Sequence, residues 1–145
     1  MKLSEHFTLQ EFTLSQTSVR LGIDNTPSQE VIKNLTNLCE YILEPIRRRI
    51  DKPLHISSGY RSKALNKAIG GATNSQHITG QAADITVSGM STEQLYQWVK
   101  KSHLYYDQLI QEFDSWVHVS FSNIARLEAM RATRVNGRTI YVFDK

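Results

Sequence analysis

The longest regular pattern of hydrophobic residues in the chain has the spacing of a helix. Apolar side chains recur there every three or four positions: Val31, Leu35, Leu38, Ile42, Ile46 and Ile50. This spacing places them on one face of a long helix. Thr26-Pro27-Ser28-Gln29 predicts its start, with Thr26 as the N-cap, Pro27 in the first turn and Gln29 completing a capping box. Pro45 predicts a kink further along, because proline removes a backbone hydrogen bond.

Shorter patterns complete the expected set of elements. Short helices are expected within residues 8–22 and over 61–69, the latter ending at Gly70-Gly71. A capping box at Ser91 to Gln94 predicts another helix start. Strands are expected at 54–56, 82–87, 106–113, 116–121 and 139–143. Helices first and strands late predict an α+β fold, with a mainly antiparallel sheet and helices packed on one face.

Length and composition fit one globular domain, which we expect over residues 1–145. A chain of 145 residues can bury a substantial core. The single cysteine, Cys39, excludes an internal disulfide and a zinc site built from several cysteines. Cys39 follows Leu35 by four positions in the helical pattern, so we interpret it as a core residue. No apolar run approaches the roughly 20 residues that span a bilayer, and we expect no membrane partner.

The charge balance is mildly basic. Lys and Arg total 17 against 14 for Asp and Glu, a net charge of +3, which favours encounters with anionic polymers such as cell wall or nucleic acid. The densest basic run, Arg47-Arg48-Arg49, has no interleaved aromatic residues. We interpret this run as the solvated end of a helix and expect no nucleic-acid partner.

Three residues are potential metal ligands, and strand alternation places two of them. In 116–121, Val117, Val119 and Phe121 alternate with the other residues and must face the core, so His118 points to the opposite face. The same alternation in 82–87 turns Asp84 away from the core. His77 lies seven positions before Asp84, in a loop that leads into this strand. Together the three side chains could form one metal site.

Two histidines and one carboxylate leave a fourth zinc position open to water, as in catalytic zinc sites. Zn²⁺ is the expected ion, although other divalent metals accept the same ligands. Hydrolysis also needs a base that is not a ligand. Leu109 and Phe113 share one face of their strand, and Glu112 shares the other with Ile110, so Glu112 is the first candidate and Asp114 the second.

These motifs resemble those of a known peptidase family. Ser-x-His-x-x-Gly-x-Ala-x-Asp at 75–84, followed by Trp-Val-His-Val at 116–119, is similar to the zinc D-Ala-D-Ala carboxypeptidases. That group includes phage endolysins that cut the L-Ala-D-Glu bond and is structurally akin to the hedgehog signalling domain. Upstream segments at 43–47 and 57–62, Leu-Glu-Pro-Ile-Arg and Ser-Ser-Gly-Tyr-Arg-Ser, extend the resemblance over most of the chain.

The resemblance implies a role for each site residue. His77, Asp84 and His118 match the metal ligands, and Arg61 matches an arginine that binds substrate carboxylate or the developing oxyanion. In several relatives the catalytic carboxylate lies three residues before the last histidine, which is Ser115 here. Glu112, six residues before His118, matches its placement in other branches.

The implied function is zinc-dependent hydrolysis of peptide bonds in peptidoglycan stem peptides. The bond is either a terminal D-Ala-D-Ala or an internal one, as in endolysins. The alternative is a non-catalytic cell-wall-binding module that keeps the fold and the metal. We expect a monomer. The start MKLSEHFTLQEF lacks the apolar stretch of a secretory signal, so we expect cytoplasmic synthesis and action on the wall after release or export by another route.

Overall fold

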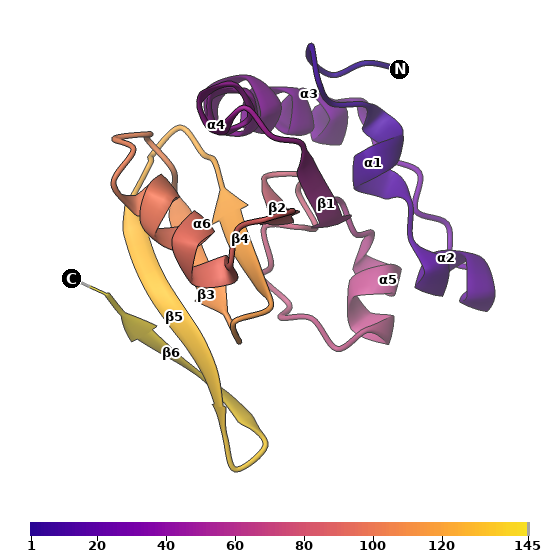
Figure 1. Ribbon diagram of the computed structural model, residues 1–145. Helices are drawn as coiled ribbons and strands as arrows, with labels where there is room; N and C mark the ends of the chain where they lie inside the picture. Colours follow the sequence, from indigo (N-terminus) through magenta and orange to yellow (C-terminus); the bar gives the residue numbers. More distant parts are fainter. Residues whose placement is uncertain (145) are drawn as a thin grey trace.

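A six-stranded mixed sheet forms the centre of the molecule (Figure 1). The computed structural model describes residues 1–144. Strand order is β1-β2-β4-β3-β5-β6, where β3 and β5 pair in parallel and the other neighbours pair antiparallel. The strands are β1 (Leu54–Ser58), β2 (Ala82–Val87), β3 (Gln108–Glu112), β4 (Trp116–Ser120), β5 (Glu128–Val135) and β6 (Arg138–Phe143). The α+β class is thus confirmed.

Helices precede and interrupt the strands. They are α1 (Leu9–Thr13), α2 (Gln16–Leu21), α3 (Gln29–Leu38), the π-helical turn η1 (Cys39–Leu43), α4 (Glu44–Ile50), α5 (Lys63–Ala68) and α6 (Thr92–Lys100). The expected capping box at the start of α6 is present, with Ser91 and Gln94 as its two members. No helix among residues 1–144 has both the length and the apolar character needed to cross a bilayer.

The start of α3 differs from the sequence prediction by two residues. Ser28 is the N-cap, and its hydroxyl accepts a hydrogen bond from the Val31 N–H at 3.2 Å. Thr26, the predicted cap, instead donates its N–H and its hydroxyl to the Asp24 carboxylate at 3.0 and 2.6 Å. Both Thr26 and Ser28 are residue types that can cap a helix. The prediction of Thr26 was wrong because its hydrogen bonds to Asp24 hold it in a turn before the helix begins.

The long helix adapts to Pro45 through a widened turn. The Glu44 N–H bonds to the Cys39 carbonyl, five residues back, and α4 then begins with proline in its first turn. This π-turn lies directly before Pro45, the residue that lacks an N–H. Prolines and π-turns are both known causes of kinks in helices. Cys39 is fully buried within this turn, which confirms its place in the core, and burial raises the pKa of its thiol to about 12.

The sequence pattern did not predict one of the strands, β5. β5 has the sequence Glu-Ala-Met-Arg-Ala-Thr-Arg-Val, in which Glu, Ala, Met and Arg favour helices. It forms a strand because its neighbours on both sides, β3 and β6, satisfy its backbone hydrogen bonds. The β5–β6 hairpin extends from the body of the molecule in yellow in Figure 1.

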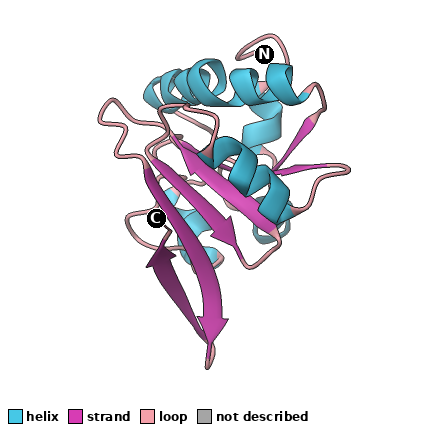
Figure 2. Cartoon of the chain, turned by 60° about the vertical axis from the view of Figure 1, so that its left-hand side comes forward, coloured by secondary structure: helices cyan, strands magenta, loops and turns pink. Residues whose placement is uncertain are grey.

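The two faces of the sheet have different roles. One face packs Ala83, Ile85, Val117 and Val119 against α3 and α6 and forms the main core (Figure 2). The opposite face carries Asp84 and His118, together with a small buried cluster of Ile110, Met130 and Ala132. Strand parity therefore assigned both potential ligands to the correct face.

Phe113 is an exception to the predicted alternation. It packs beside the cluster on the site face and not with Leu109 in the main core. Phe113 lies just beyond β3 with a φ of 57°, so the alternation of the strand no longer determines its direction.

Candidate metal centre and cleft

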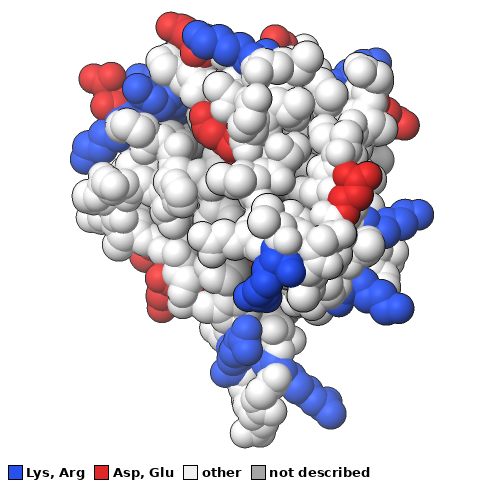
Figure 3. Space-filling model, turned by 90° about the vertical axis from the view of Figure 1, so that its right-hand side faces the viewer, with Lys and Arg blue, Asp and Glu red and all other residues white. Residues whose placement is uncertain are grey.

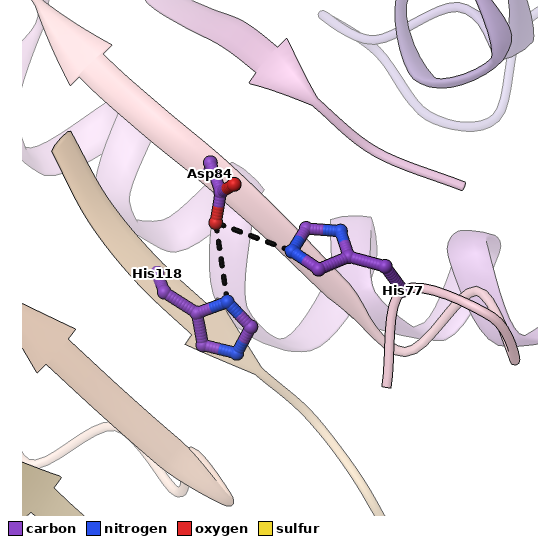
Figure 4. A group of neighbouring side chains, drawn as sticks. All are labelled: His77, Asp84 and His118. Carbon is purple, nitrogen blue, oxygen red and sulfur yellow. Dashed lines mark hydrogen bonds and ion pairs between the residues drawn. The ribbon is translucent and has the colours of Figure 1, made fainter. Parts of the chain in front are cut away.

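The three side chains that the sequence predicted as ligands converge in the structure (Figure 4). Asp84 Oδ1 lies 3.2 Å from His77 Nε2 and 3.1 Å from His118 Nδ1. The two imidazole rings meet edge to face at 5.1 Å. All three residues are buried, with 2%, 8% and 8% of His77, Asp84 and His118 exposed.

Different elements supply these ligands. Asp84 on β2 and His118 on β4 are direct partners in the antiparallel ladder, so their side chains emerge side by side. His77 comes from the loop between α5 and β2, where the Arg61 N–H donates to the His77 carbonyl at 3.0 Å. Gly80 seats the same loop on α3: its φ is +76°, and a Cβ there would lie 2.8 Å from the Val31 carbonyl oxygen.

The hydrogen bonds of His77 make the cluster suited to a cation. His77 Nδ1 lies 2.6 Å from the Gly59 carbonyl oxygen, which can only accept, so Nδ1 carries the proton. In the neutral ring, Nε2 then directs a lone pair at the carboxylate of Asp84. A metal ion between these atoms resolves the repulsion, and its ligands at zinc distances of about 2.0–2.1 Å would lie roughly 3.3 Å apart. The observed separations fit this requirement.

Electrostatics favour neutral histidine and ionised aspartate, the forms that bind metal. Burial lowers the pKa of His77 and outweighs the attraction of Asp84. Burial opposes ionisation of Asp84, but the two histidines beside the carboxylate prevail and hold its pKa below the usual range. The shifts of His77 and Asp84 therefore favour the forms that bind metal, a neutral imidazole and a carboxylate.

Glu112 lies beside this cluster and Asp114 does not. Glu112 Oε1 is 4.0 Å from His118 Nδ1, and burial together with the Asp84 charge raises the pKa of Glu112. Asp114 instead accepts a hydrogen bond from the Gln111 side chain, while its carbonyl accepts one from Thr92 of α6. Gln111 and α6 belong to the other face of the sheet, so of the two predicted bases the structure brings only Glu112 to the site.

Arg61 is half-buried, and its guanidinium is under the influence of the two carboxylates. Burial lowers its pKa against the opposing charges of Asp84 and Glu112. One guanidinium nitrogen, Nη2, lies 3.5 Å from Ser75 Oγ, whereas Nε is buried without a hydrogen-bond partner among the described residues. Trp116 is the cross-strand partner of Glu112, and a hydrogen bond from its side chain partly offsets the rise in the pKa of Glu112. The buried Arg61 Nε thus remains as a donor beside the site.

A cleft of about 1010 Å³ leads to the cluster. Asp84, Arg61 and Trp116 line it at the site, and residues of β1, α2 and the N-terminal segment line it further away. Viewed from the side of α1, α2 and α5, charged side chains lie mostly at the rim of the molecule, and much of the surface between them is uncharged (Figure 3).

A His, Asp and His cluster at the side of a cleft, with a spare carboxylate nearby, is an arrangement that metallohydrolases use. Comparison with known proteins narrows this class. The model of the peptidase M15 family matches residues 5–120, and the chain belongs to this family. The resemblance inferred from the motifs is therefore confirmed.

A curated relative is similar to part of the chain. The zinc D-Ala-D-Ala carboxypeptidase of Streptomyces albus G is 49% identical over 35 residues. The matched segment covers 24% of this chain and 14% of that relative's length. Family and relative together indicate a metallopeptidase and imply zinc.

Proposed function

We propose that the chain hydrolyses peptide bonds in peptidoglycan stem peptides with a zinc ion held by His77, Asp84 and His118. The observation that carries this proposal is the convergence of the two histidines on one oxygen of Asp84, beside the non-ligand carboxylate of Glu112. Membership of the peptidase M15 family supports the reaction class, and the name of the Streptomyces relative supports the choice of metal. The chain would act on the wall after release from the cell.

The residues divide the chemistry between them. Zinc, when bound, acidifies a water molecule and polarises the scissile carbonyl. Glu112 accepts the proton of the attacking water and delivers it to the leaving amine. Its raised pKa suits this double role, because the carboxyl then holds a proton more readily. Arg61 stabilises the negative charge that develops on the carbonyl oxygen.

The size of the cleft favours an internal bond as substrate. Its volume of about 1010 Å³ lies at the upper end of ligand pockets, which span roughly 300–1000 Å³. An internal bond needs room for peptide residues on both sides of it, and a stem peptide could occupy both the site and the part of the cleft beside β1. We therefore propose an endopeptidase of the endolysin type and keep removal of the terminal D-Ala as the second possibility.

Digestion of purified stem peptides with the zinc-loaded protein tests the proposal. Mass spectrometry should find two peptide fragments, whereas loss of one D-Ala would mark a carboxypeptidase. Glu112→Gln should lower kcat by at least about 100-fold and retain its zinc, because only the proton carrier changes. Glu40→Gln, at an exposed position of η1, serves as the matched control and should retain wild-type activity.

Two results would overturn parts of this assignment. A Glu112→Gln variant as active as the wild type would remove Glu112 from the mechanism. A wild-type protein that binds zinc and stem peptides without cleaving them would instead be a non-catalytic wall-binding module.

A further inference from the structure

The face of the sheet that carries the metal ligands continues across β3 and β5 to β6. Along one row of cross-strand partners, Trp116 lies opposite Glu112, Glu112 opposite Ala132, and Ala132 opposite Tyr141. Partners in such a row point to the same face of the sheet. Adjacent strands are about 4.8 Å apart, so the backbones of Glu112 and Tyr141 are separated by roughly 10 Å. Tyr141 therefore stands on the site face, two strands from the proposed base.

The surface between them is apolar and closed. Ile110, Met130 and Ala132 form a buried cluster on this face, and Ala132 is 1% exposed. The next row places Phe143 opposite Met130, on the same side as Tyr141. Tyr141 thus lies over a packed part of β5 and not at the tip of the hairpin, which is formed by Asn136 and Gly137.

The phenol of Tyr141 is available to a ligand. Its side chain is exposed, with 54% of the residue accessible, and among residues 1–144 its hydroxyl has no hydrogen-bond partner. Burial of part of the ring, with the negative charges of Glu112 and Asp84, raises the pKa of Tyr141. The register of β3, β5 and β6 places this phenol on the same face as Glu112, and the raised pKa favours its protonated, donating form.

We propose that Tyr141 is a substrate-contacting residue, which donates a hydrogen bond to the bound peptide on the β6 side of Glu112 and whose ring forms a wall of the binding site there. This inference rests on the proposed function. The β5–β6 hairpin lies beyond residues 5–120, the region matched by the family model. Tyr141 would thus add a specificity element from a segment outside that region, on the side of the site opposite β1.

The neighbouring residue on the same strand provides a matched control. Ile140 is exposed to a similar degree, at 42%, but alternation in β6 directs it to the opposite face of the sheet. A variant at Ile140 changes the same hairpin without changing the site face. Any general effect of disturbing β6 should therefore appear in Ile140→Ala as well as in the Tyr141 variants.

Peptide affinity is measured by calorimetry in the Glu112→Gln background, where turnover does not interfere. The probe is a purified muropeptide with its stem peptide, and each protein is zinc-loaded with its metal content verified. Tyr141→Phe should weaken binding about 3- to 10-fold, the value of one hydrogen bond. Tyr141→Ala should weaken it further because the ring is also lost, and Ile140→Ala should stay within about twofold of the parent. In the active protein, the Tyr141 variants should mainly raise KM.

The outcomes separate this inference from the proposed function. Unchanged peptide affinity in Tyr141→Ala would overturn the role of Tyr141 even if the wild type cleaves the peptide. Equal losses in Tyr141→Ala and Ile140→Ala would also overturn it, since they would indicate a structural effect of the hairpin. Binding that depends on Tyr141 in a wild type without hydrolysis would support the inference and contradict the proposed reaction. Absence of both binding and hydrolysis would overturn both proposals.

Discussion

Among residues 1–144, two clusters of histidine and carboxylate could hold a metal ion by geometry, yet they differ in how their atoms are hydrogen-bonded. In each, three ligand atoms lie within 4.8 Å of one another. One cluster consists of His77, Asp84 and His118 on the site face of the sheet. The other, formed by Glu5, His6 and Glu44, joins the N-terminal segment to the start of α4.

The N-terminal cluster has its hydrogen-bonding groups already paired. His6 Nδ1 lies 2.7 Å from one oxygen of Glu44, and the His6 N–H donates to the other at 3.1 Å. Glu5 is exposed and pairs with Arg48 at 3.3 Å. This cluster thus fixes the N-terminal segment to the buried carboxylate of Glu44, and no additional cation is required to balance it.

The site cluster is paired differently. His77 has its Nδ1 proton on the Gly59 carbonyl, which leaves Nε2 and His118 Nδ1 both facing the same oxygen of Asp84. Proximity of ligand types therefore does not define a metal site by itself. What distinguishes the two clusters is the Gly59 carbonyl, which holds the proton of His77 on Nδ1 and leaves the Nε2 lone pair facing Asp84, where a cation can satisfy it.

Removal of a ligand should separate the clusters most clearly. Asp84→Asn keeps the shape of the side chain but removes the charge that both histidines face, and zinc affinity should fall by more than about 100-fold. His6→Ala should leave zinc binding unchanged. Equilibrium zinc titration of both variants checks this, and a loss of affinity in His6→Ala alone would reverse our assignment of the clusters.

A substitution at Gly59, whose carbonyl oxygen bonds to His77, should have the next largest effect on zinc affinity. A Cβ added at Gly59 would lie 2.6 Å from the Phe12 Cα, so Gly59→Ala must displace the backbone whose carbonyl orients His77. We expect zinc affinity to fall about tenfold or more and unfolding free energy to fall by about 1–3 kcal/mol. Zinc titration and denaturant unfolding measure the two effects. Wild-type affinity in this variant would show that the Gly59 carbonyl does not orient the ligand.

Glu44→Gln should affect stability without affecting the metal. The substitution weakens both hydrogen bonds to His6 at a nearly inaccessible position, so unfolding free energy should fall by about 1–3 kcal/mol. Glu40→Gln, exposed on the preceding turn, should be neutral. Denaturant unfolding measures the unfolding free energy of each variant, and zinc titration measures its zinc affinity. A Glu44→Gln variant that loses zinc would contradict a purely structural role.

The smallest expected effect is a pH dependence of the stability that Glu44 contributes through its hydrogen bonds to His6. Burial opposes ionisation of Glu44, but hydrogen bonds from His6 prevail and lower its pKa below the ordinary value of 4.5. A carboxyl group whose pKa is lower in the folded protein than in the unfolded one stabilises the fold at pH values above its unfolded-state pKa. This stabilisation is lost as the pH falls through the folded-state pKa. The stability advantage of wild type over Glu44→Gln should therefore shrink below about pH 4.5. Thermal unfolding across pH 3–7 measures it, and a constant difference would argue against this linkage.

Much of the site could be predicted from the sequence because alternation in a strand is a local property. The apolar residues of β2 and β4 determined which face Asp84 and His118 occupy, and the motif around His77 supplied the third ligand. Choosing between Glu112 and Asp114 needed the structure, because the chain leaves β3 at Phe113 and turns Asp114 toward α6.

Tyr141 could not have been found from sequence alone. Its position relative to Glu112 depends on β5, whose helix-favouring residues conceal a strand, and on the pairing of β5 in parallel with β3. Pairing between distant segments is set by tertiary packing and not by local pattern. The expected strand at 139–143 was correct. Because β5 was not predicted, the strand with which it pairs and the residues beside Tyr141 could not be inferred.

Diffraction from zinc-loaded crystals at the zinc absorption edge tests the central claim most directly. We expect one anomalous peak about 2.0–2.2 Å from His77 Nε2, Asp84 Oδ1 and His118 Nδ1, with a coordination position open to the cleft. A zinc-loaded crystal with no peak among these three atoms, or with its peak beside Glu44 and His6, would contradict it.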